Sequence, residues 1–377
     1  FPISNSLRFE DGDSAYLNFT PSAGNRRTWT YSTWVKRGNI TTAEFPLLAA
    51  TTDGNNRFYF RFEQNQLRVY WNVAGTANEV LTSAVYRDAS SWYHVVLAVD
   101  TTQSTDTNRI KIYVNGVQQT LTGTYIPQNT DTQINLNVAQ LIGKKDTDDT
   151  FYDGYLTEIN LIEGTALTPS SFGETKNDIW IPKDTAGLTF GDEGYRLQFK
   201  QVGTGTASTS TIGADTSGNT NHLTSNALVA SDVVPDSPTN NFATLNPIAT
   251  DTTGATNHSF SEGSLKVSTG SNSWWNAFGT IGISSGKYYW EYYALGSGSV
   301  DQNIGVCTFD WYRGSNGGAD SADAYSLYAQ SAGVGILYTD GATGVDKGSG
   351  YFWTWGNIMS VAFDADTGKI WYAKNGT

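Results

Sequence analysis

The chain has 377 residues, which is enough for two or three domains with cores of their own. Only 16% of the residues are charged and 38% are hydrophobic, so Thr, Ser, Asn, Gln and Gly must cover much of the surface, as in extracellular β-proteins. The formal net charge of −13 argues against a nucleic-acid partner, because phosphate binding needs clustered Lys and Arg. The sequence contains no run of 18 apolar residues, so no membrane-spanning segment is expected.

Alternation of large apolar with polar residues predicts a series of short strands in the first half of the chain. The pattern recurs at residues 29–35, 57–62, 67–71, 92–99 and 109–114. The last of these is followed by Asn115-Gly116, a dipeptide preferred in two-residue hairpin turns because both turn residues need positive φ. Many short strands with turns between them favour a β-sandwich or barrel.

The composition changes at residues 201–256, which are rich in Gly, Ser, Thr and Asn. Proline at positions 235, 238 and 247 interrupts any long strand there. The segment keeps several apolar residues: Leu223, Leu228, Val233, Val234, Phe242 and Leu245. We therefore expect an irregular connector that packs along a domain surface, and strand patterning resumes from residue 257 to the end.

Motifs in the first 200 residues resemble a laminin G-like domain of the concanavalin A-like lectin superfamily. The best match is the strand 92–100 followed by the hairpin end at 112–116. Residues 141–143 and 152–159 resemble the closing strands of that domain. The resemblance implies a jelly-roll sandwich.

The last third, residues 257–377, resembles a SPRY domain. Residues 285–291 and 304–306 match its early strands, and residues 356–376 match its later hairpin. Asn357 stands where the family usually has Asp. A SPRY domain normally continues for several strands past this Asn-Gly turn, so we expect this second sandwich to be C-terminally incomplete in the sequence.

Residues 212–223 and 236–247 resemble a connector in structural proteins of marine bacteriophages, where it joins these two module types. The expected fold class is therefore all-β, with two antiparallel sandwiches at 1–200 and 257–377 and the connector at 201–256. The three-part order implies a bacteriophage structural protein, tail-fibre-like or a head-fibre or decoration component, on the virion surface.

Catalysis is not expected. Glucanases of the lectin superfamily carry their nucleophile and acid in a Glu-x-Asp-x-x-Glu pattern on one strand, and the sequence has no such pattern. The three histidines, His94, His222 and His258, lie in separate segments without a nucleophile motif, and the single Cys307 excludes an intrachain disulfide.

The laminin G-like resemblance also implies a Ca²⁺ ion at the rim of the sandwich. Asp100 and Asp153 are the candidate ligands, because Ca²⁺ prefers carboxylate oxygens. The alternative is that these residues only fill strand-end turns, as Asp often does. No ligand set and no other cofactor is fixed by the sequence.

Aromatic residues, 13% of the chain, supply the candidates for a ligand site. By the SPRY resemblance, several lie in loops or at strand ends on one end of the second sandwich. The candidates are Trp274, Trp275, Trp311, Tyr312, Arg313, Trp353 and Trp355. Core packing is the alternative role for each of these rings.

The expected function is reversible, non-catalytic adhesion to host-surface carbohydrate or to another virion protein. Weak sites would be multiplied by copy number, and fibre proteins are usually trimers, so a homo-oligomer is expected from the resemblance. Two rival functions stay open: a bacterial secreted or cell-surface adhesin, and a coat protein that binds only capsid subunits. A third alternative is a glycan hydrolase.

Overall fold

The computed structural model describes residues 1–146, 149–250, 258–269, 276–297, 301–308, 324–340 and 344–377. The chain divides into two compact units, one of residues 1–247 with 260–267 and one of residues 248–259 with 268–377. The predicted all-β class is confirmed: antiparallel sheets dominate both units, and the helical elements described are short 3₁₀ turns. None of the described helices is long and apolar enough to cross a membrane.

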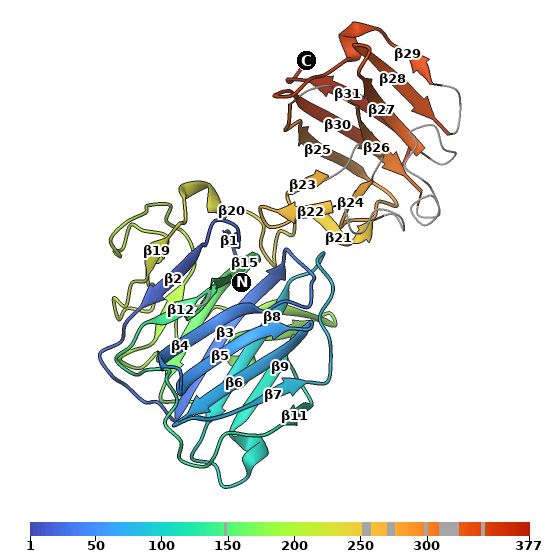
Figure 1. The fold of residues 1–377 in the computed structure, drawn as a ribbon. Helices are drawn as coiled ribbons and strands as arrows, with labels where there is room; N and C mark the ends of the chain where they lie inside the picture. The colour runs from blue at the N-terminus through green and yellow to red at the C-terminus, as the bar shows by residue number, and fades with distance from the viewer. Residues whose placement is uncertain (147–148, 251–257, 270–275, 298–300, 309–323, 341–343) are drawn as a thin grey trace. The chain divides into compact units, whose positions relative to one another are not determined.

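Unit 1 is built on two eight-stranded sheets that face each other (Figure 1). The first, sheet A, runs in the order β10 (Val117–Gln118), β9 (Ile110–Val114), β8 (Tyr93–Asp100), β3 (Thr28–Arg37), β15 (Gly154–Glu163), β1 (Ser6–Phe9) and β20 (Val233–Val234), with β18 (Tyr195–Leu197) also beside β15. The second, sheet B, runs in the order β11 (Leu121–Gly123), β7 (Thr76–Thr82), β6 (Gln66–Val73), β5 (Asn56–Glu63), β4 (Phe45–Asp53), β12 (Gln140–Ile142), β2 (Tyr16–Phe19) and β19 (Thr224–Asn226).

Alternating residues of both sheets meet in one hydrophobic core. Phe58, Phe60 and Phe62 of β5 point into it, as the alternating pattern predicts, and Leu97 of β8 meets them from sheet A. The hairpin turn after β9 has Asn115 at φ 48° and Gly116 at φ 83°, as predicted for this dipeptide.

Short elements complete unit 1. They are the pairs β13 (Lys144–Lys145) with β14 (Thr150–Phe151) and β16 (Gly173–Lys176) with β17 (Ile179–Pro182), and the 3₁₀ turns η1 (Asp106–Asn108), η2 (Pro169–Ser171) and η3 (Ala230–Asp232). Outside this set, two further pairs lie within residues 245–279: β21 (Leu245–Thr250) with β24 (Ala277–Gly279), and β22 (His258–Ser261) with β23 (Lys266–Thr269).

The expected connector is more regular than the sequence suggested. Its strand β20 pairs with β1 and its strand β19 pairs with β2, so the segment adds an edge strand to each sheet. Ile212, Leu223 and Leu228 are buried in the sandwich core. Unit 1 therefore extends past residue 200, where we expected its boundary, because the segment supplies core side chains and backbone pairing.

Unit 2 has a three-stranded and a four-stranded sheet. The first consists of β25 (Lys287–Tyr293), β30 (Ile358–Asp364) and β31 (Lys369–Lys374); the second consists of β26 (Gln302–Cys307), β27 (Ala324–Gln330), β28 (Val334–Thr339) and β29 (Val345–Asp346), with η4 (Ser349–Tyr351) after it. Both sheets contribute to one small core, for example through Met359 and Leu327.

Candidate functional site

The outer face of sheet B carries a row of aromatic and charged side chains. Phe58, Phe60 and Phe62 of β5 face the core, so Tyr59 and Arg61 between them face outward. Strand pairing sets Tyr59 opposite Tyr70 and Arg61 opposite Arg68 on β6. We call these four residues the ladder face.

Rings and cations stack on the ladder face. The rings of Tyr59 and Tyr70 are stacked, with centroids 5.3 Å apart and planes 15° apart. The guanidinium carbon of Arg61 lies 5.5 Å from the Tyr70 centroid, within cation–π range. Tyr70 is partly exposed, so a ligand can reach one side of this stack.

Carboxylates hold both arginines in place. Arg61 pairs with Glu63 at 2.6 Å, and Arg68 pairs with Glu79 at 2.9 Å. Even so, Nη1 of Arg61 and Nε of Arg68 are buried with no hydrogen-bond partner among the described residues. Such unpaired donors cost free energy unless a ligand or water supplies an acceptor.

A pocket of about 510 Å³ opens at one end of unit 1. It is lined by Asp11, Gly12, Asn39, Thr41, Ala43, Glu44, Phe45, Lys145, Asp149, Thr150 and Phe151. We call it the rim pocket. Glu44 joins it to the ladder face, because its carboxylate lies 2.8 Å from Lys145 Nζ and 3.5 Å from Arg61 Nε.

An acidic group lies next to the rim pocket. Asp153 precedes β15 and is 1% exposed, and neither of its carboxylate oxygens has a partner among the described residues. Burial, with the negative charges of Glu10 and Asp11, raises the pKa of Asp153 to about 8. Burial also raises the pKa of Glu10 to about 6, although backbone N–H groups of Glu262 and Gly12 donate to it.

Part of unit 1 is similar to a known family. Residues 11–171 match the family model of the concanavalin A-like lectin/glucanases superfamily. This part of the chain is similar to the lectin-like domains of that superfamily. No curated protein matches the chain. The match ends at residue 171, so the SPRY resemblance of the last third depends on its own motifs.

Several solved structures are similar to parts of the chain. A heptameric SAP-like pentraxin from Limulus polyphemus is 16% identical over 41% of this chain and 71% of its own, with a TM-score of 0.32. A Bacteroides ovatus protein, provisionally assigned to carbohydrate binding, is 15% identical over 60% of this chain and 59% of its own, with a TM-score of 0.41. Domain 4 of the GH43 arabinanase AbnA from Geobacillus stearothermophilus, in complex with arabinotriose, is 20% identical over 39% of this chain and 65% of its own, with a TM-score of 0.27.

The two candidate calcium ligands lie at opposite ends of β3. Asp100 pairs with Thr28 at the start of that strand, whereas Asp153 lies beside Gly38, directly after its end. The ends of a ten-residue strand are roughly 30 Å apart, so one ion cannot bind both residues.

The two carboxylates also differ in their partners. The oxygens of Asp100 accept hydrogen bonds from Thr102 and Gln103 of its own turn. The unpartnered buried oxygens of Asp153 fit a hard cation, while Asp100 fits the alternative of a filled turn. Among the described residues, no group of three or more His, Cys, Asp or Glu is gathered in a metal-binding arrangement.

The aromatic candidates in unit 2 are only partly described. Trp274, Trp275, Trp311, Tyr312 and Arg313 lie outside the described residues.

Two more candidates are placed by the structure. Trp353 has no exposed surface and packs in the core of unit 2, so it acts in core packing rather than as a contact ring. Trp355 is partly buried against the same core.

Other aromatic rings of unit 2 are exposed, and the strand pattern of the sequence does not predict their exposure. Tyr289 is 63% exposed, Tyr293 53% and Trp371 52%. Strand pairing sets Tyr289 and Trp371 on either side of Ala362, on one face of the three-stranded sheet. Alternation shows which side chains share a face, but not which face another layer covers.

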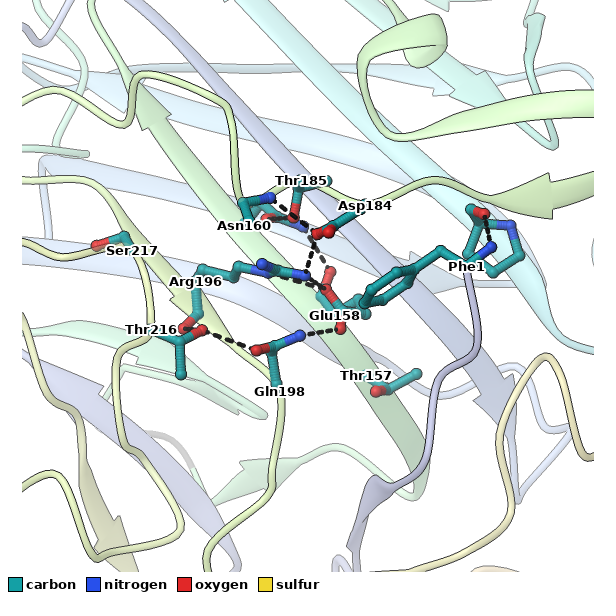
Figure 2. Close-up of polar contacts among 12 residues, drawn as sticks. Phe1, Thr157, Glu158, Asn160, Asp184, Thr185, Arg196, Gln198, Thr216 and Ser217 are labelled. Carbon is teal, nitrogen blue, oxygen red and sulfur yellow. Dashed lines mark hydrogen bonds and ion pairs between the residues drawn. The ribbon is translucent and has the colours of Figure 1, made fainter.

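A polar cluster on sheet A has the residue types of a binding site, but the hydrogen-bonding groups of its central side chains are occupied by one another. Glu158 sits at a bulge of β15 with φ 45°, and its two oxygens accept from Arg196 at 3.2 Å and from Gln198 at 2.7 Å (Figure 2). Arg196 also pairs with Asp184 at 3.1 Å, and its guanidinium lies 5.6 Å from the Phe1 ring centroid. These contacts fasten the start of the chain to sheet A and indicate a structural role.

Proposed function

We propose that the chain is a non-catalytic adhesion protein whose lectin-like domain binds a surface glycan across the rim pocket and the ladder face. The observation that carries this proposal is Glu44, which lines the pocket and also approaches Arg61 of the ladder face. A sugar ring has apolar faces that stack on aromatic rings, and its hydroxyl groups pair with carboxylates and guanidinium groups.

The partners of the ladder face suit a neutral or weakly charged sugar. Arg61 and Arg68 are already neutralised by Glu63 and Glu79, so a strongly anionic ligand would gain little. The partly exposed carboxylates of Glu63 and Glu79 can instead accept hydrogen bonds from sugar hydroxyl groups. The exposed side of Tyr70 supplies the stacking surface.

We also propose that Asp153 binds a Ca²⁺ ion, with Glu10 or Asp11 nearby. The ion would neutralise carboxylates whose mutual repulsion and burial now raise the pKa of Asp153. Asp11 also lines the rim pocket, so the ion would order that wall of the pocket.

Placement on a bacteriophage particle, as a fibre or decoration protein, is part of the same proposal. Its support is the resemblance of residues 212–223 and 236–247 and the order of the three parts of the chain. Display in several copies would raise the avidity of a weak sugar site. Detection of the chain in purified virions separates this placement from a bacterial cell-surface adhesin.

The decisive experiment measures binding of the full chain to a panel of immobilised bacterial surface polysaccharides. We expect Tyr70→Ala to weaken binding about tenfold, or roughly 1.4 kcal/mol, because the stacking surface is lost. Chelation of Ca²⁺ is expected to weaken binding of the native chain as well.

The matched control is Tyr293→Ala, the same change at an exposed ring of unit 2, which we expect to keep native affinity. Loss of binding in Tyr293→Ala with retention in Tyr70→Ala would place the sugar site in unit 2 and contradict the rim-pocket site. Failure of every polysaccharide to bind would favour the coat-protein alternative, and new reducing ends in the incubated polysaccharide would show a hydrolase.

A further inference from the structure

Lys36 of β3 is a buried cation with oxygen partners from one distant segment. Its side chain has no exposed surface. Its Nζ donates to Asp236 Oδ2 at 2.8 Å, to Asn241 Oδ1 at 2.9 Å and to the Phe242 carbonyl at 2.6 Å. Buried lysine is rare in proteins, and where it occurs the surroundings either hold its charge or favour the neutral amine.

The carboxamide of Asn241 is fixed beside this amine. Its Nδ2 donates to the Ser90 carbonyl at 2.7 Å, which leaves Oδ1 directed at Lys36. An amide held at hydrogen-bond distance from an amine is close to the separation from which bond formation begins.

Asp236 is placed to accept a proton from the Lys36 amine. Its Oδ2 contacts Lys36, and its Oδ1 accepts from Trp92 Nε1 at 3.1 Å. Aromatic rings shield the Lys36 side of this cluster, since Tyr155 has its centroid 5.8 Å from the Lys36 nitrogen and Trp92 is 8% exposed, whereas Asn241 is exposed. Burial lowers the pKa of Lys36, although the charge of Asp236 opposes this effect.

We propose that Lys36 and Asn241 react to form an intramolecular amide cross-link. Asp236 takes a proton from the Lys36 ammonium, and the neutral amine attacks Cγ of Asn241 to form a carbon–nitrogen bond. The bond from Cγ to Nδ2 then breaks as Asp236 returns this proton to the departing nitrogen. The nitrogen of Lys36 still carries one proton more than an amide holds, and it passes that proton through Asp236 to the same departing nitrogen. One ammonium ion leaves for each cross-link, so the chain loses the mass of one ammonia, and no oxidant or reductant is needed.

The cross-link joins residues 205 positions apart in the chain. It would close most of unit 1 into one covalent loop and fix the end of the expected connector to β3. The cross-link is independent of the glycan site, because Lys36, Asp236 and Asn241 line neither the rim pocket nor the ladder face.

The test is the intact mass of the full chain after denaturation. We expect a mass lower than the sequence mass by one ammonia, and a tryptic product in which residues 28–37 remain joined to residues 201–266. Lys36→Arg and Asn241→Ala should each restore the full sequence mass of that variant. Because Asn241 is exposed, its replacement leaves the core unchanged and guards against a variant that simply fails to fold.

The matched control is Lys183→Arg, a change at an exposed lysine that donates only to the Ser170 carbonyl, and it should keep the ammonia deficit. A native chain of full sequence mass would overturn the proposal. A deficit of one water with Lys36 joined to Asp236 would overturn it too, because Asp236 would then be the acyl donor rather than the proton carrier.

Discussion

His94 shows how a single buried residue makes the stability of unit 1 depend on pH. Its Nδ1 accepts from Trp180 Nε1 at 3.0 Å, and its Nε2 lies 2.9 Å from Ser32 Oγ, so the neutral ring satisfies both neighbours. The ring of Trp34 packs against it in a tilted arrangement, with centroids 4.9 Å and planes 33° apart. Burial lowers the pKa of His94 to about 3. The ring fastens Trp180 of β17 to sheet A.

The expected consequence is a loss of stability in acid. The unfolded chain protonates His94 below its ordinary pKa of about 6.5, whereas the folded chain resists protonation down to about pH 3. The free energy of unfolding should therefore fall by up to about 1.4 kcal/mol per pH unit in this range through His94 alone. Urea unfolding at pH 7, 5 and 4 checks this. His94→Gln, which cannot ionise, should show a smaller fall, and an equal fall in both proteins would refute the assignment.

Some candidate residues can be named from the sequence because their chemistry does not depend on the tertiary fold. Asp153 was a candidate ion ligand and proves to be buried with unpartnered oxygens. Tyr70 and Arg61 cannot be singled out from the sequence, because alternation alone does not say how far other side chains cover this face of β5 and β6. Of the four ladder-face residues, Tyr70 is partly exposed and the other three are buried. The sequence places Lys36 in a strand motif but does not predict its buried contacts, because its partners Asp236 and Asn241 come 200 or more positions later in the chain.

At the scale of elements, the long strands were predictable and the short ones were not. Residues 92–99 and 109–114 alternate over enough positions to define a strand, and they form β8 and β9 almost as expected. β19 and β20 have only three and two residues. Such lengths contain too little periodicity, and their pairing is decided by the edges of β2 and β1.

Leu223 tests whether the expected connector is an integral part of the sandwich. Its side chain is fully buried in the core directly before β19. Leu223→Ala should lower the free energy of unfolding by about 2–5 kcal/mol, measured by urea denaturation, because it leaves a cavity. Val229→Ala, a change at a side chain that is 56% exposed, is the control and should cost little. Equal effects of the two changes would show that the segment contributes no core.

At the scale of the whole molecule, two compact units with separate cores predict two unfolding transitions. In scanning calorimetry, Leu223→Ala should lower the midpoint of one transition, and Leu327→Ala, in the core of unit 2, should lower the other. A single transition displaced by both changes would mean that the two cores unfold together.

The edge strands of the two large sheets of unit 1 are short, and this affects how the protein behaves at high local concentration. Sheet A finishes in β10 and β20, of two residues each, and sheet B finishes in β11 and β19, of three residues each, within the described part of the chain. A border this short presents few free backbone groups to a neighbouring molecule, which limits strand exchange and fibrillar aggregation. Many copies of the protein can then be held at high local concentration and remain separate molecules.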